Sequence, residues 1–158
     1  MSGMSDLRKP VLICQLSGVC IFIAAFFLPS CGLGPGSSLP GYVCAAVALA
    51  STPRFLVHPN PGDRFNELLV VLSGWVNPLV LLCLLASLSK RLAKIRLFPA
   101  AATLLCLAAS GIFFLDERAH SSAPLSPLVG YYLWVVGTLL ILAPEWLRRR
   151  RKSAVSCA

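Results

Sequence analysis

The sequence predicts an all-α integral membrane protein with four transmembrane helices, cytoplasmic N and C termini, and a short re-entrant or interfacial helix in its first extracytoplasmic loop. Of 158 residues, 57% are hydrophobic and only 13% are charged, which is too little charge to cover a soluble surface. The apolar residues form unbroken blocks instead of stripes of helical period. Eleven of the fourteen Lys and Arg residues lie in three clusters that alternate with pairs of these blocks.

The four predicted spans are the longest apolar blocks. The first runs without a charge from Val11 to Leu28, which is eighteen residues. At ~1.5 Å per residue such a block covers roughly 27 Å, close to the ~30 Å of a bilayer's hydrocarbon layer. Backbone polar groups must be paired within lipid, so each block should be helical. The spans cover residues 11–28, 68–88, 97–115 and 128–147 of a single membrane domain, residues 1–158, with extracytoplasmic loops 29–67 and 116–127.

The block Tyr42–Ala50 is apolar but has only nine residues before polar residues and Pro53 interrupt it. Basic residues near span ends are retained in the cytoplasm, so their distribution tests whether this block crosses. Four spans place eleven basic residues inside and three outside, whereas a fifth span with the same N-terminus gives five inside and nine outside. The charge distribution favours four spans, and a crossing by residues 42–50 is the alternative.

The first block has a second interpretation. Arg8 and Lys9, the apolar run and the segment Leu28–Cys31 resemble a lipoprotein signal that ends in a lipidated Cys31. Pro29 is a poor residue beside such a cleavage site, and the run is long for a signal peptide. A retained first span is therefore the preferred interpretation.

Polar groups inside the predicted spans are few. No ionisable side chain lies in the central part of any span, which disfavours a proton-coupled transporter, a proton relay or a haem site. Gln15 and Asn77 are the strongest polar candidates. Pro78 should kink the second span and free the carbonyl of Gly74, and the Asn77 amide can bond that carbonyl or another helix. Helix packing is the simpler interpretation, and a pocket at the kink is the alternative.

Aromatic residues mark both ends of the last span. Tyr131, Tyr132 and Trp134 lie at its outer boundary and Trp146 at its inner one, the pattern of an aromatic belt. A stacking surface for a ligand is the alternative. The complete set of candidate pocket or kink residues is Gln15, Trp75, Asn77, Pro78, Tyr131, Tyr132 and Trp134.

Cys31 and Cys44 are the only two of the seven cysteines placed on the oxidising side by the predicted topology. They are thirteen positions apart and form a candidate disulfide. No C-x-x-C pair is present, so a thiol oxidoreductase lacks its usual motif. The sequence indicates no catalytic residue, cofactor or metal site.

Three short motifs resemble those of a group of small, uncharacterised bacterial four-span inner-membrane proteins. The first span ends in Leu28-Pro29 with Cys31 close behind. Trp75 stands two residues before Asn77-Pro78, and the last span opens with the Gly-Tyr-Tyr-Leu-Trp sequence of residues 130–134. The resemblance implies a topology and a bacterial inner-membrane location, and it implies no activity.

The functional prediction is a non-enzymatic membrane interaction module or accessory subunit. Its partners would be anionic lipid head groups at the basic clusters and a membrane protein or second copy of the chain, with no role for nucleic acid. A small transporter or channel component with a cavity near Asn77 is one alternative. A membrane thiol-redox protein that uses Cys31 and Cys44 is the other.

Overall fold

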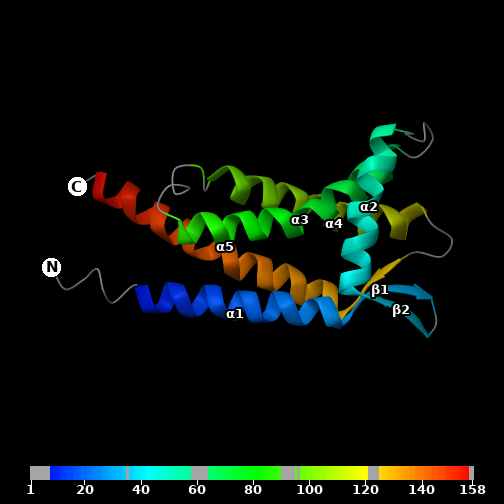
Figure 1. The fold of residues 1–158 in the computed structure, drawn as a ribbon, viewed down its shortest axis with the longest axis horizontal. Coiled ribbons are helices and arrows are strands. Elements are labelled where there is room, and N and C mark those ends of the chain that lie inside the picture. The colour runs from blue at the N-terminus through cyan, green and yellow to red at the C-terminus, as the bar shows by residue number, and fades with distance from the viewer. Residues whose placement is uncertain are drawn as a thin grey trace.

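The computed structural model describes residues 8–34, 36–57, 64–89, 95, 97–120 and 125–156, which are mostly helical with a small sheet (Figure 1). Helix α1 runs beside α5, and α3 runs beside α4, while α2 crosses the molecule between the sheet and the far edge of α3. The start of α1 and the end of α5 lie at the same end of the molecule. In chain order the elements are α1 Arg8–Phe27, β1 Pro29–Gly34, β2 Ser37–Pro40, α2 Gly41–Val57, α3 Arg64–Leu88, α4 Leu97–His120, β3 Ser126–Pro127 and α5 Val129–Ser156.

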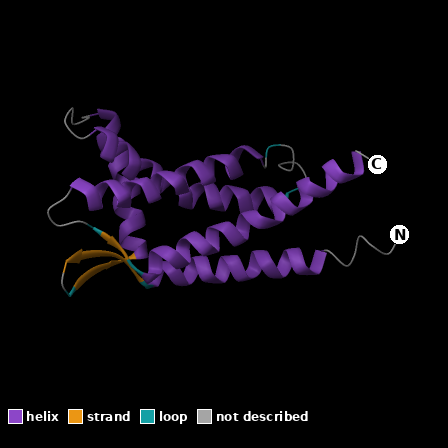
Figure 2. Cartoon of the chain, turned by 180° about the vertical axis from the view of Figure 1, so that it is seen from behind, coloured by secondary structure: helices purple, strands orange, loops and turns teal. Residues whose placement is uncertain are grey.

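The sheet joins the helix ends opposite the chain termini (Figure 2). Strand β1 is central and pairs antiparallel with both β2 and β3. Gly36 has a φ of 80° in the β1–β2 turn, a conformation that glycine adopts without strain. The backbone N–H of Gly41 donates to the carbonyl of Leu28 at 3.1 Å, and that of Leu128 donates to the carbonyl of Ser30 at 3.0 Å. These bonds hold the starts of α2 and α5 against the end of α1.

The prediction of four transmembrane helices is wrong. Among the described residues, only Arg64–Ser87 in α3 and Leu97–His120 in α4 are long and apolar enough to cross a membrane. The apolar stretches Val11–Phe27 and Val129–Pro144 have seventeen and sixteen residues, or about 24–26 Å of helix. Helix α1 has twenty residues but stops at Phe27 because Pro29 begins β1, so its uncharged part falls one residue short of the eighteen counted in the sequence.

The predicted loops contain regular structure, which also corrects the all-α prediction. Residues 29–67 hold β1, β2, α2 and the start of α3, and β3 forms within 116–127 after α4 has continued to His120. The helix expected at 42–50 extends over seventeen residues and continues through Pro53. The sheet was missed because β1 and β2 are short and rich in glycine, serine and proline, which read as turn residues.

Small residues allow the helices to approach closely. A Cβ atom on Gly137 of α5 would lie 2.7 Å from the backbone nitrogen of Phe22 in α1. A Cβ on Gly74 of α3 would lie 2.8 Å from the carbonyl carbon of Ala48 in α2. At these two positions only a residue without a side chain fits. Gly111 differs, because a Cβ there would have open space, with the Tyr131 hydroxyl as its nearest neighbour at 4.0 Å.

Candidate ligand pocket

A cavity of about 220 Å³ lies where the sheet and α2 meet the pair α3 and α4 and the start of α5. Engineered cavities of about 150 Å³ with apolar walls bind benzene, so this space accommodates a single substituted ring. Its walls are mostly apolar, with a few polar groups. The polar side chains are Ser30, Cys31, Cys44, Ser73, Asn77, Ser110 and Tyr131, and the aromatic ones are Phe26, Phe113, Phe114, Tyr131 and Trp134.

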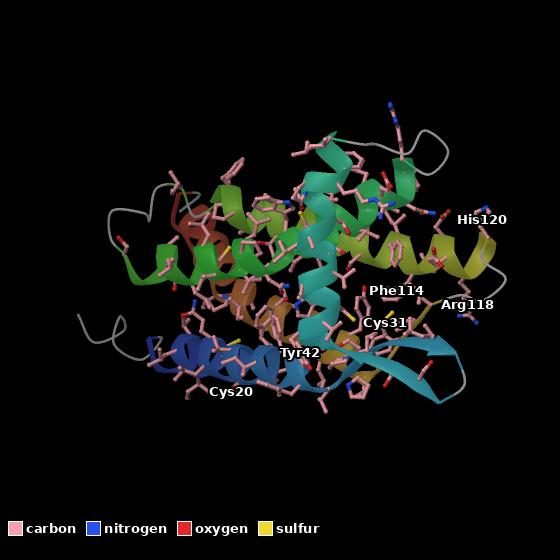
Figure 3. All side chains as sticks on the ribbon, turned by 45° about the vertical axis from the view of Figure 1, so that its right-hand side comes forward. Cys20, Cys31, Tyr42, Phe114, Arg118 and His120 are labelled. Atoms are coloured by element: carbon pink, nitrogen blue, oxygen red, sulfur yellow. The ribbon has the colours of Figure 1, made fainter. Side chains whose placement is uncertain are left out.

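Two free thiols form part of this wall. Cys31 lies in β1 opposite Leu39 of β2 and is only 8% exposed. Cys44, in the first turn of α2, is half-buried and donates to the carbonyl of the same Leu39 over 3.9 Å. The register of the hairpin thus brings both thiols close to one residue, where each shifts the pKa of the other. Figure 3 labels Cys31 at the sheet and Phe114 near it on α4, whereas Cys20 lies along α1.

The hydrogen bond between the thiols separates their acidities. It lowers the pKa of Cys44 below its ordinary value, and burial opposes this only in part. The same bond raises the pKa of Cys31, and burial and the negative charge of Glu117 raise it further. The first proton therefore leaves the pair readily, because the remaining S–H stabilises the thiolate, and the second leaves with difficulty.

This asymmetry predicts a pH-dependent labelling pattern. Iodoacetamide reacts with thiolates, so Cys44 should be alkylated with a midpoint below the ordinary thiol pKa and before Cys31. Cys31→Ala removes the donated bond, raises the Cys44 pKa and should slow alkylation of Cys44 several-fold at neutral pH. Peptide mass spectrometry over a pH series measures both rates. An unchanged or faster Cys44 rate in Cys31→Ala would contradict the assignment.

The indole of Trp134 joins two helices across the pocket. Its Nε1–H donates to Oδ1 of Asn77 at 2.9 Å, linking α5 to α3. The amide N–H groups of Asn77 contact no acceptor within the described part of the chain. The role foreseen for Asn77, a bond across to another helix, is therefore present, and its donors are left over for a bound molecule.

A second pair of polar side chains, Ser110 and Tyr131, offers the pocket a hydrogen-bond acceptor. The Ser110 hydroxyl donates to the carbonyl of Leu107 at 2.8 Å and lies 3.1 Å from the hydroxyl of Tyr131. Since Ser110 has a single proton, Tyr131 donates its own proton to Ser110. The Tyr131 oxygen then presents lone pairs. Its ring packs edge-to-face on Phe114 at a centroid distance of 4.8 Å, which holds it in place.

The structure brings together five of the nine residues singled out from the sequence. Cys31, Cys44, Asn77, Tyr131 and Trp134 all line the cavity. The remaining four candidates lie outside its lining: Gln15 on α1, Trp75 and Pro78 on α3, and Tyr132 on α5.

Several lining residues carried no functional signal in the sequence. Ser110, Phe113 and Phe114 all line the cavity, and all three lie within the apolar block 97–115. The polarity of Ser110 near the outer end of its block was a usable signal. Nothing in the sequence distinguished the two phenylalanines.

A second, more polar hollow of about 370 Å³ adjoins the first and shares Val70 and Phe113 with it. Arg54, Glu67 and Glu117 line this hollow. The apolar pocket is therefore bordered on one side by a hollow with charged side chains. Within the described ranges, no group of three or more His, Cys, Asp or Glu side chains is placed to hold a metal ion.

Comparisons of the chain with protein-family models, with curated proteins and with solved structures find no match. The resemblance to small bacterial inner-membrane proteins stays a prediction. The structure does not describe the side chains of the three basic clusters or of the predicted inner aromatic residue Trp146.

Proposed function

We propose that the protein is a membrane-associated binding protein that takes a small, largely apolar, ring-containing ligand into the pocket between Cys31 and Trp134. The observation that carries the proposal is the pocket's composition. Apolar and aromatic walls enclose a space of single-ring size, and a few directed polar groups converge on it, the usual character of a small-molecule site. This refines the interaction module expected from the sequence by naming what it binds.

Association with a membrane is supported by α3 and α4. Only 28% of the apolar window in each helix is buried, whereas the core helix of a soluble domain is mostly buried. Large apolar side chains point outward instead: Leu81 is 58% exposed and Leu105 is 67% exposed. The connection between the two helices carries the cluster Lys90–Arg96, which favours the cytoplasm at that end. The pocket then lies toward the opposite face.

A binding role fits the cavity better than a transport role. A transport pathway through the apolar helices would reach both polar candidates, Gln15 and Asn77. The cavity includes Asn77 and not Gln15, so its polar groups gather at one end of the molecule. We therefore favour a ligand that enters and leaves by the same end.

Single-tryptophan proteins test the binding proposal in lipid nanodiscs. The probe is 4-bromophenol, whose bromine quenches indole fluorescence on contact. The Trp134-only protein carries Trp75→Phe and Trp146→Phe, and the Trp75-only protein carries Trp134→Phe and Trp146→Phe. We expect saturable quenching of Trp134 and only linear, non-saturable quenching of Trp75, which is 45% exposed on α3. Lipids with brominated chains should instead quench Trp75.

Matched substitutions on α2 locate the bound probe. Ala45 lines the pocket, and its neighbour Ala46 is exposed and does not. Ala45→Phe should fill the cavity and weaken probe binding at least about tenfold, the effect of losing roughly 1.4 kcal/mol. Ala46→Phe should leave binding unchanged. Linear quenching of Trp134, or equal affinity in both variants, would overturn the proposal.

A further inference from the structure

The geometry points to a redox site at the pocket wall, in which Cys31 and Cys44 pass two electrons to a para-benzoquinone bound in the cavity. This inference rests on the proposed ligand pocket and adds a reaction to it. A quinone ring matches three separate features of the site: the size of the cavity, the polar groups that line it and the pair of thiols in its wall.

The thiols are placed to act as a pair. They come from the adjacent elements β1 and α2, lie beside the same residue, Leu39, and line the same cavity. Cys31 is only 8% exposed, and Cys44 is half-buried. A bulky protein disulfide cannot reach such a thiol, whereas a flat ring inside the cavity can. The lowered pKa of Cys44 supplies a thiolate at the less buried of the two positions.

The polar groups of the pocket match both oxidation states of a quinone. The leftover amide N–H donors of Asn77 suit a quinone carbonyl, which only accepts hydrogen bonds. The lone pairs of Tyr131, whose proton is given to Ser110, suit the O–H of the reduced ring. Aromatic walls at Phe114, Tyr131 and Trp134 provide edges and faces for the ring itself.

The reaction balances without another reactant. The S–H bond of Cys31 breaks, and its sulfur forms one S–S bond with the Cys44 thiolate, whose own proton has passed to solvent. Two electrons from the thiols, the Cys31 proton and one proton from solvent pass to the two quinone oxygens, so the quinone is reduced to a hydroquinone. The protein is left as a Cys31–Cys44 disulfide, which an external dithiol returns to the starting state by thiol–disulfide exchange at Cys44.

The test uses the full chain in nanodiscs, fully reduced and kept without oxygen, mixed with 2,3-dimethoxy-5-methyl-1,4-benzoquinone. We expect one quinone to be reduced per protein, followed by ultraviolet absorbance, and a Cys31–Cys44 disulfide in the peptide map. Cys44→Ser should abolish both. Ala45→Phe should slow the quinone reaction at least tenfold while leaving oxidation of the pair by diamide unchanged, and Ala46→Phe should change neither.

If Ala45→Phe fails to fold, a competition experiment on the unaltered protein replaces it. Added 4-bromophenol should occupy the pocket and slow the quinone reaction. The inference is overturned if the quinone arylates a thiol permanently, if diamide forms no Cys31–Cys44 disulfide, or if neither pocket filling nor 4-bromophenol slows the reaction. Failure of the redox step is separable from failure of binding. A Cys31→Ser, Cys44→Ser protein that still shows saturable quenching of Trp134 leaves the binding function standing.

Discussion

Replacing Gly137 by alanine is expected to destabilise the protein by about 1–3 kcal/mol, the range for overpacking a close contact. The added Cβ would meet the backbone nitrogen and Cα of Phe22 at 2.7 and 2.9 Å. Backbone atoms cannot rotate away as a side chain can, so α1 and α5 must separate. Strand β1 follows α1 directly, and Tyr131 lies near the start of α5. Separation of the two helices therefore also disturbs the pocket. Thermal unfolding in detergent measures the change.

Gly111→Ala is the matched control, and it should act in the opposite direction. A Cβ at this position has only the Tyr131 hydroxyl within reach, at 4.0 Å. Alanine is favoured over glycine inside a helix by up to about 1 kcal/mol, so this variant should be neutral or more stable. A Gly137→Ala protein as stable as Gly111→Ala would show that α1 and α5 are not in close backbone contact.

Breaking the Trp134–Asn77 bond should weaken both the fold and the pocket. Trp134→Phe leaves Asn77 Oδ1 without its donor, and an unsatisfied group of this kind costs about 1–3 kcal/mol. Asn77→Leu strands the indole N–H at a similar cost. The double variant should cost less than the sum of the two, with a coupling energy of about 0.5–3 kcal/mol. Denaturant titration of the four proteins measures this coupling.

Measurements of quinone binding distinguish the loss of the Trp134–Asn77 bond from a general loss of helix packing. Asn77→Leu should weaken quinone binding about tenfold, because it removes the donors offered to the carbonyl as well as the interhelical bond. Trp75→Phe, on the exposed face of the same helix, should change stability by no more than about 0.5 kcal/mol. Strictly additive stabilities would show that the bond does not form in the folded protein.

The sequence predicted a helical, apolar chain, and most of the polar residues that line the pocket were among its candidate residues. Asn77, Tyr131 and Trp134 were visible because polar and aromatic residues are conspicuous in apolar blocks. Cys31 and Cys44 were paired only because the predicted topology placed both on one side. The extent of the helices was the weak point, because an uncharged run does not show how far a helix continues beyond it. Helix α1 ends at Phe27, one residue before the predicted end, whereas α5 continues to Ser156, well beyond residue 147.

Composition alone determined that this is a mostly helical chain with helices suited to a membrane, because burying or embedding so much apolar surface leaves few other solutions. Which residues share a pocket was decided only by tertiary structure. The Cys31–Leu39 register, the crossing of α2 over Gly74 and the pairing of α5 with α1 bring together side chains as far apart in the chain as Cys31 and Trp134. Such contacts depend on backbone approach at glycines and on strand register, and neither leaves a periodic signal in the sequence.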